Sequence, residues 1–138
     1  MPTLTDSKIY RIIDANFNRA KEGLRVCEDI CRFVWDQKAW TRSYKNCRHD
    51  LSKVIGRLAL TKVIAARNIA EDVGRGSTVA EFKRSAVNDI YYANAQRVKE
   101  SIRVLEEFAK LLNKNIAQDL KKLRYKIYAL EKKIVADM

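Results

Sequence analysis

Residues 15–33 read ANFNRAKEGLRVCEDICRF, and residues 93–111 read ANAQRVKESIRVLEEFAKL. Aligned without a gap, the two stretches are identical at eight of nineteen positions. Both contain the pattern N-x-x-R-x-x-E-x-x-R-x-x-E, whose polar residues are Asn16, Arg19, Glu22, Arg25 and Glu28 in one copy and Asn94, Arg97, Glu100, Arg103 and Glu106 in the other. Helix packing requires an apolar period and leaves charged positions free to vary. The repeated charges therefore indicate a role of their own.

A second apolar series follows each of these stretches, with the same steps in both copies. The two series are Trp40, Tyr44, Cys47, Leu51, Val54 and Leu58, and Ile116, Leu120, Leu123, Ile127, Leu130 and Ile134. Alternating steps of four and three residues place side chains on one face of a helix. Each half of the chain is thus predicted to be a helical hairpin. Two such hairpins predict an all-α four-helix bundle with pseudo-two-fold symmetry.

We expect a single helical domain over residues 1–138, with long helices at about residues 7–35, 38–62, 79–112 and 115–136. The pattern Thr78-x-x-Glu81 matches a capping box and is expected to begin the third helix. The repeats, residues 7–62 and 79–136, are joined by an unrepeated segment, residues 63–78. Because this segment is charged and contains Gly74 and Gly76, it is either a functional loop or a plain crossover.

The chain is strongly basic, with a net charge of +11 and a pI of about 9.7. Such a balance favours an anionic partner, which includes nucleic acid, an acidic surface and phosphorylated small molecules. A solvated, lysine-rich exterior is the alternative explanation. Charge alone does not choose among these.

The cysteine content argues against disulfides and against zinc. Three cysteines form no closed disulfide set, which fits a reducing compartment. The second copy replaces Cys27, Cys31, Cys47 and His49 with Leu105, Ala109, Leu123 and Tyr125. We therefore expect core positions there rather than a metal site. No apolar run approaches a membrane span and the N-terminus lacks a secretory signal, so a cytoplasmic protein is expected.

The repeated polar residues lie at the margin of the predicted core face, where two interpretations are open. Asn16, Arg19 and Glu22, with their copies, either form an inter-helix network that fixes the register of the bundle or line a polar pocket between the long helices. In the second case Arg19 and Arg97 would bind phosphate oxygens through their planar guanidinium groups. Arg48 and Arg124 are another repeated pair, for which a place at the same cavity is open.

Four stretches of the chain resemble a known family. They are DANFNRAKEGLRVCEDICRF (14–33), AARNIAEDVG (65–74), ANAQRVKESIRVLEEFAKLL (93–112) and LRYKIYALE (123–131). They are similar to a small family of thiamine biosynthesis, the monofunctional hydroxymethylpyrimidine-phosphate kinases, which occur alone or fused in front of thiamine-phosphate synthase. The resemblance spans nearly the whole chain. It implies ATP-dependent phosphorylation of hydroxymethylpyrimidine phosphate to its diphosphate, with Mg²⁺ as cofactor. The chain holds no synthase barrel, so synthase activity is not expected of it.

The resemblance also suggests roles for individual residues. The expected phosphate-binding residues are Arg19, Arg97 and Arg67. The expected carboxylates for Mg²⁺, or for orienting those arginines, are Asp72, Glu22 and Glu100, with Asp72 as the metal ligand. The expected substrate-binding residues also include Asn16, Asn94, Arg48 and Arg124.

One position departs from the family pattern and two questions stay open. Where an aspartate is expected in the central motif, the chain has Asn68, so Asp72 or Glu71 would have to take its part. Which half binds ATP and which binds the pyrimidine is undetermined. A homodimer is also open, because the two-fold repeat identifies no interface.

Two other functions compete with the kinase. The first is a non-catalytic partner of thiamine-phosphate synthase, which the fusions in the family suggest. The second is a basic helical protein that binds nucleic acid. The latter predicts a continuous basic face, whereas the repeated arginines alternate with glutamates and no recognition motif is evident.

Overall fold

The computed structural model describes residues 3–58, 60–77 and 83–138. Its helices are α1 (Asp6–Asp29), the π-helical turn η1 (Ile30–Val34), α2 (Lys38–Ile55), the short α3 (Leu60–Ala65), α4 (Val87–Ala109) and α5 (Lys114–Asp137). No strand occurs in those three ranges. The predicted all-α class is therefore confirmed. None of the described helices is long and apolar enough to cross a membrane.

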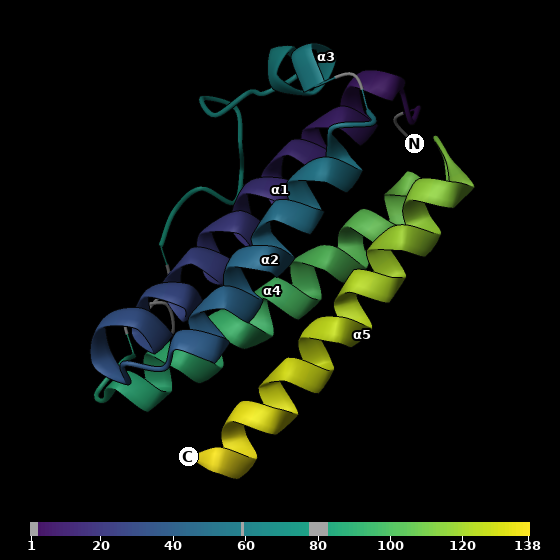
Figure 1. Cartoon of the computed structure of the whole chain (residues 1–138). Coiled ribbons are helices and arrows are strands. Elements are labelled where there is room, and N and C mark those ends of the chain that lie inside the picture. Colours follow the sequence, from purple (N-terminus) through teal and green to yellow (C-terminus); the bar gives the residue numbers. More distant parts are fainter. Residues whose placement is uncertain (1–2, 59, 78–82) are drawn as a thin grey trace.

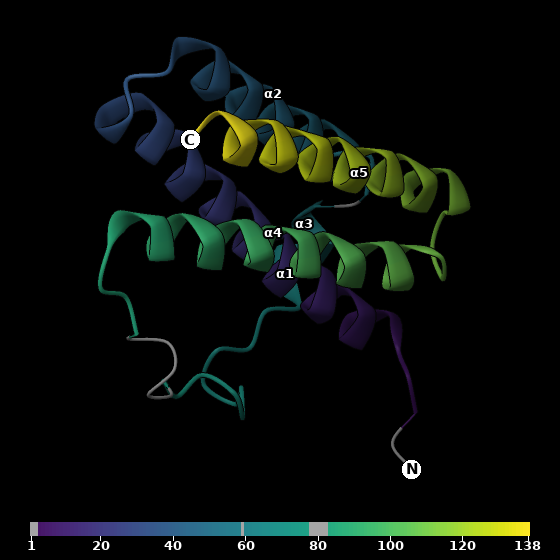
Figure 2. The same cartoon turned by 90° about the horizontal axis from the view of Figure 1, so that it is seen from below.

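The four long helices form a bundle built from two hairpins, α1–α2 and α4–α5 (Figure 1). Helix α1 packs against α2 and α4, and α5 packs against the same two helices. Helices α1 and α5 run in one direction and α2 and α4 in the other, so packed neighbours are antiparallel (Figure 1). The predicted duplicated hairpin is thus present. Because α2 and α4 are parallel, the chain between them has to return from one end of the bundle to the other. Helix α3 packs against α1, and the described segment after it lies outside the four long helices (Figure 2).

The core consists of the apolar seams of both repeats. Tyr44, Leu51, Leu120 and Ile127 are fully buried. Burying a large aliphatic side chain contributes about 1.5–3 kcal/mol, so these seams supply much of the bundle's stability.

The three cysteines belong to this core. Their thiols are free and buried. Burial raises the pKa of Cys27 and Cys31 to about 12, and that of Cys47 to about 11. They occupy core positions like the Leu105, Ala109 and Leu123 that replace them in the second copy.

Two predicted helix ends are wrong. The second helix ends at Ile55 rather than Lys62, because Arg57 and Leu58 donate to carbonyls three residues back and close the helix in a tight turn after Gly56. Residues 60–65 then form the separate helix α3.

The third helix begins at Val87 rather than near residue 79. The carboxylate of Asp89 caps it by accepting the backbone N–H groups of Ser85 and Ala86 and the hydroxyl of Ser85, at 3.2, 3.1 and 2.8 Å. The predicted capping box at Thr78 and Glu81 lies outside the described residues.

Candidate functional site

A cavity of about 590 Å³, here called the central cavity, lies between α1 and α4. Its lining consists of five repeat-related pairs: Asn16 and Asn94, Arg19 and Arg97, Glu22 and Glu100, Gly23 and Ser101, and Val26 and Val104. Each half of the chain therefore contributes the same set of positions. The structure brings together six of the residues singled out in the sequence, from positions far apart in the chain.

The two helices come close together beside this cavity. A Cβ atom added to Gly23 would lie 2.6 Å from Cγ2 of Val98 and 3.1 Å from the carbonyl oxygen of Asn94. Its repeat partner Ser101 is also small and is 4% exposed. Small residues at these two positions thus permit the backbone approach that holds the polar side chains of α1 and α4 near one another.

The two asparagines are fixed in the same way. The Asn16 amide donates to the carbonyl of Ile12 at 2.9 Å, and the Asn94 amide donates to the carbonyl of Ile90 at 2.8 Å. Each side chain is thereby tied to the preceding turn of its own helix. Its amide oxygen remains available, and on Asn16 it accepts a long contact of 3.5 Å from Arg19.

The arginines of the central cavity have no carboxylate partners. Arg97 makes no hydrogen bond or ion pair within the described part of the chain, and Arg19 makes only its long contact with Asn16. Glu22 is equally free there, while Glu100 accepts a hydrogen bond of 3.1 Å from Gln96. Guanidinium groups with unused donors are suited to anions such as phosphate, which they bind in a planar, two-point geometry.

A second cavity of about 710 Å³, here called the outer cavity, shares Asn16, Arg19 and Glu22 with the central one. It extends along the N-terminal turns of α1 to the segment after α3. Its further charged lining residues are Lys8, Arg11, Asp14, Arg67 and Asp72. The two cavities adjoin at their shared residues, so a ligand longer than a single phosphate fits along α1.

Arg67 is held at this outer cavity by Asp14. Its Nε and Nη2 atoms donate to the two carboxylate oxygens at 2.7 and 2.6 Å, a two-point ion pair that raises the pKa of Arg67. Asp14 is 6% exposed, and Asn18 donates to it as well, at 3.1 Å. The pair fastens the segment after α3 to α1. Of the five N–H donors of Arg67, the two on Nη1 and the second one on Nη2 remain outside this ion pair.

Sequence reasoning did not identify Asp14 as a site residue. Its signal was the position next to the repeated Ala-Asn, where the second copy has Tyr92. A charged residue at the edge of one repeat, where the other copy has an uncharged residue, indicates a contact that only this half of the chain makes.

The residues of the central motif form a compact turn. Asn68 donates to Glu71 at 3.0 Å and accepts its backbone N–H at 3.1 Å, and Asp72 accepts the N–H of Gly74 at 3.0 Å. Asp72 faces the outer cavity, as does Asn68. No group of three metal-binding side chains occurs among the residues described. Mg²⁺ usually takes one or two carboxylates together with substrate phosphates, so Asp72 and Glu22 fit such a shared site but not an all-protein one.

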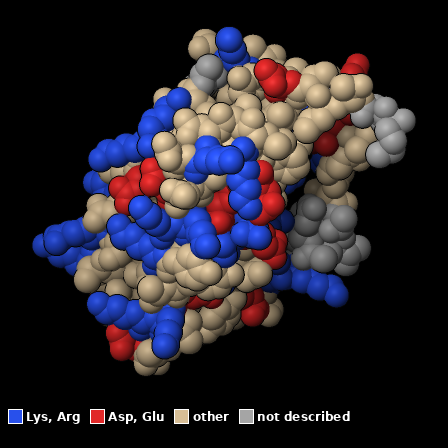
Figure 3. Space-filling model, turned by 90° about the vertical axis from the view of Figure 1, so that its right-hand side faces the viewer, with Lys and Arg blue, Asp and Glu red and all other residues tan. Residues whose placement is uncertain are grey.

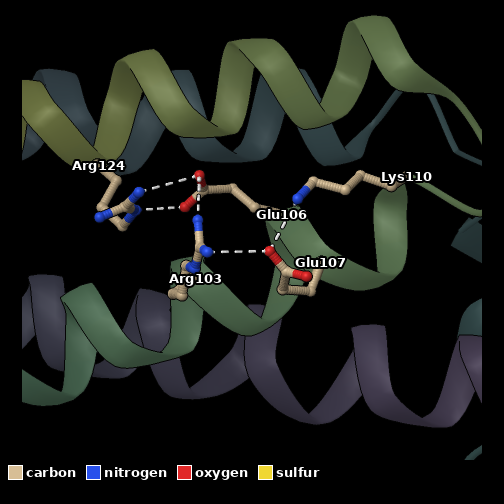
Figure 4. Close-up of polar contacts among 5 residues, drawn as sticks. All are labelled: Arg103, Glu106, Glu107, Lys110 and Arg124. Atoms are coloured by element: carbon tan, nitrogen blue, oxygen red, sulfur yellow. Dashed lines mark hydrogen bonds and ion pairs between the residues drawn. The ribbon is translucent and has the colours of Figure 1, made fainter.

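Neither Arg48 nor Arg124, for which a place at the cavity was open, lines the central or the outer cavity. Arg48 donates through Nε to Glu28 at 3.0 Å, and Arg124 donates to both oxygens of Glu106 (Figure 4). The glutamates are 5% and 2% exposed. Buried carboxylates require cations close by, so these two arginines act as the ion-pair partners of buried glutamates within the protein.

The outer arginines of the motif complete this arrangement. Arg25 lies 3.9 Å from Glu28 and Arg103 lies 3.7 Å from Glu106, while Arg103 and Lys110 both contact the exposed Glu107 (Figure 4). We call the two repeat-related sets, Arg25–Glu28–Arg48 and Arg103–Glu106–Arg124, the buried ion-pair clusters.

The surface charge does not form a continuous basic face on the side seen in Figure 3. Lys and Arg cover much of that side, but Asp and Glu lie among them (Figure 3). This interleaving gives no support to nucleic-acid binding along that face.

Comparison with known proteins gives one family and a set of longer relatives. The model of the ThiD2 family matches residues 11–133. A thiamine-phosphate synthase of Nostoc punctiforme is 38% identical over 128 residues, which is 92% of this chain and 35% of the relative. Another, from Thermosynechococcus vestitus, is 38% identical over 131 residues, 94% of this chain and 36% of the relative. One from Rhodopirellula baltica is 35% identical over 122 residues, 88% and 32% of the two chains.

The chain spans about a third of the length of these relatives. No solved structure matches it.

Proposed function

This chain belongs to the ThiD2 family, and from that premise we propose that it transfers the terminal phosphoryl group of ATP to hydroxymethylpyrimidine phosphate, forming the diphosphate. The relatives are named thiamine-phosphate synthase, which supports a role in thiamine biosynthesis. The observation that carries the proposal is the central cavity, which is lined by the repeat-related Arg19 and Arg97, neither of which has a carboxylate partner in the described part of the chain. Two such groups are what a reaction between two phosphates needs.

The chemistry requires little beyond positioning and charge neutralisation. An oxygen of the acceptor phosphate forms a new bond to the γ-phosphorus of ATP while the bond to the β–γ bridging oxygen breaks. ADP leaves with the bonding electron pair. An acceptor phosphate that is already a dianion near neutral pH has no proton to lose, so no general base is needed. Arg19 and Arg97 hold the two phosphates and offset their mutual repulsion.

Mg²⁺ fits this site as an ion shared between protein and nucleotide. It would be held by Asp72 and Glu22 together with phosphate oxygens, and it neutralises charge on the triphosphate when bound. Asn16 and Asn94, fixed by their own helices, present amide oxygens to the exocyclic amino group of the pyrimidine or to hydroxyl groups.

The same cavity predicts a preference for the phosphorylated substrate. An unphosphorylated alcohol brings no anion to Arg19 or Arg97, so it lacks the charge-assisted contacts that the phosphorylated substrate would make. We expect hydroxymethylpyrimidine itself to be a poor substrate.

A second candidate function is a non-catalytic partner of thiamine-phosphate synthase. It is favoured by the coverage of the relatives, because this chain matches only 35% of a protein named for the synthase reaction. In that case the polar cavity would bind a ligand without turnover.

The deciding experiment measures ADP release from ATP and Mg²⁺ with hydroxymethylpyrimidine phosphate, with the unphosphorylated compound as the control substrate. Turnover of the phosphate alone supports the kinase. No turnover of either compound by folded protein rejects the kinase and favours the accessory role. Arg42→Ala is the matched control variant for Arg19→Ala and Arg97→Ala, because Arg42 is an exposed arginine on α2 outside both cavities.

A further inference from the structure

The two ends of the central cavity are built from equal sets of residues but continue into unequal surroundings. The end at Asn16 and Arg19, here called the α1 end, opens into the outer cavity, where Lys8 and Arg11 line the wall. The end at Asn94 and Arg97, here called the α4 end, lacks their equivalents. The repeat positions of Lys8 and Arg11 hold Ala86 and Asp89.

The two cations of the α1 end are free to meet an anion. Lys8 donates to the backbone carbonyl of Thr3 at 3.0 Å, and Arg11 has no hydrogen bond or ion pair in the described ranges. Neither is neutralised by a carboxylate. Asp89 at the α4 end is already used, since it caps α4. Within the described ranges, the outer cavity thus adds two cations without a carboxylate partner to the α1 end, Lys8 and Arg11, beside the Arg67–Asp14 pair and the carboxylate of Asp72.

An aromatic ring distinguishes the α4 end. Tyr92 occupies the repeat position of Asp14, the residue that borders the outer cavity on α1. Its side chain is 43% exposed, and its ring meets Tyr91 edge-on at a centroid distance of 5.7 Å and an angle of 62°. By the repeat relation Tyr92 takes, relative to Arg97, the place that Asp14 takes relative to Arg19, and an exposed aromatic ring is suited to stacking on a flat heteroaromatic ring.

We propose that the α1 end binds the triphosphate of the nucleotide and that the α4 end binds the pyrimidine monophosphate. Lys8 and Arg11 hold the part of the triphosphate that the acceptor lacks, Arg97 binds the acceptor phosphate, and Tyr92 stacks on its ring. The transferred phosphoryl group lies between Arg19 and Arg97, close to the pseudo-two-fold axis. This assignment rests on the proposed kinase function and answers which half takes which substrate.

The charge difference supports this direction rather than the reverse. A triphosphate brings two more phosphate groups than a monophosphate, and each is stabilised by a cation within a few ångströms. Among the described residues that line the two cavities, cations beyond Arg19 and Arg97 are found at the α1 end. The acceptor phosphate needs only Arg97 and the axis region, while its ring needs a flat apolar surface.

Steady-state kinetics with each substrate varied in turn test the assignment. Arg11→Ala is expected to raise KM for ATP by about tenfold, the effect of losing one well-placed charged contact, with KM for the pyrimidine phosphate changed less than about twofold. Tyr92→Ala is expected to do the reverse, and Tyr92→Phe, which keeps the ring, is expected to behave as wild type. The opposite pattern, or equal effects of both variants on both substrates, would overturn the assignment.

A binding measurement separates this inference from the kinase proposal. Calorimetry with tripolyphosphate and no acceptor is expected to show binding that Arg11→Ala and Lys8→Ala each weaken by about tenfold and that Tyr92→Ala leaves unchanged. That pattern in a protein without turnover would reject the kinase and retain the polyphosphate end. Absent binding, or equal weakening by Tyr92→Ala, would reject the polyphosphate end even in an active kinase. All three side chains are at least partly exposed, so the variants are expected to fold, and circular dichroism verifies this.

Discussion

The first and last parts of one repeated motif lie in different environments in the folded protein. The Asn-Arg-Glu part, at positions 16, 19 and 22 and again at 94, 97 and 100, lines a cavity in which the arginines lack carboxylate partners. The Arg-Glu part, at positions 25 and 28 and again at 103 and 106, is drawn into the buried ion-pair clusters with Arg48 and Arg124. Identical residue types thus line a cavity in one part and form ion pairs between the helices of the bundle in the other.

Helix geometry explains the division. A step of three residues falls about 60° short of a full turn, so a motif with this spacing winds around the helix. Asn16 and Gly23 face α4, while Glu28 reaches Arg48 on α2. The α1–α4 interface leaves a cavity and the hairpin interface buries its charges. A motif that repeats every three residues is therefore expected to contribute to two interfaces, and its members need not share one function.

The largest effect is expected from removing a buried carboxylate. Glu106→Ala leaves Arg124 without its partner, and breaking a buried ion pair in this way costs about 3–5 kcal/mol. Urea denaturation measures the change in the free energy of unfolding. Glu28→Ala is expected to behave similarly, because it occupies the repeat position. A loss below about 1 kcal/mol in both variants would mean that the buried ion-pair clusters stabilise the protein no more than surface ion pairs do. The contrast between the two parts of the motif would then disappear.

The next effect concerns the other part of the motif and falls on activity. Arg97→Ala is expected to lower kcat/KM about 100-fold, equivalent to about 2.7 kcal/mol, because a preorganised charge contact to the transferring phosphates is lost. Its free energy of unfolding is expected to change by less than about 0.5 kcal/mol, since the exposed guanidinium has no partner to abandon. Full activity in a folded Arg97→Ala protein would mean that this part of the motif has a structural role in the bundle and no role in activity.

The fold could be predicted because the same apolar period occurs in both halves of the sequence. Contacts that only one half of the chain makes could not be predicted in this way. The seams from Tyr44 to Leu51 and from Leu120 to Ile127 predicted the hairpins correctly. The same seam ran on through Leu58 and so carried the predicted second helix past Gly56, where hydrogen bonds close the turn instead. A period in the sequence contains no information about such a change of hydrogen bonding.

The site was predictable to the same extent and for the same reason. The repeated Asn, Arg and Glu positions meet at the central cavity. Arg67 reaches Asp14 only because the segment after α3 returns beside α1, and nothing periodic specifies that path. The distinction between Arg19, which stays free of carboxylates, and Arg48, which is paired, depends on which helix each residue faces across a gap.

A smaller effect is expected where α1 and α4 touch beside the cavity. Gly23→Ala places a methyl group 2.6 Å from Cγ2 of Val98, and such overpacking costs about 1–3 kcal/mol. Thermal or urea unfolding measures it. Gly76→Ala is the matched control, because nothing lies within 4 Å of the added atom. The double change Gly23→Ala with Val98→Ala is expected to relieve the clash at Cγ2, and no difference between single and double variants would contradict this packing.

The smallest effect tests whether the buried ion-pair clusters require the planar shape of arginine or only its positive charge. Arg124→Lys keeps a cation near Glu106 but removes the planar group that donates to both carboxylate oxygens. We expect a loss of about 1 kcal/mol in the free energy of unfolding, well below that of Glu106→Ala, because the buried carboxylate retains one charged donor. Arg19→Lys, in the other part of the motif, is expected to leave stability unchanged and to lower activity. If Arg124→Lys were as damaging as Glu106→Ala, the two-point geometry rather than the charge would hold the cluster. If Arg19→Lys destabilised the fold to the same degree, the two parts of the motif would have one structural role after all.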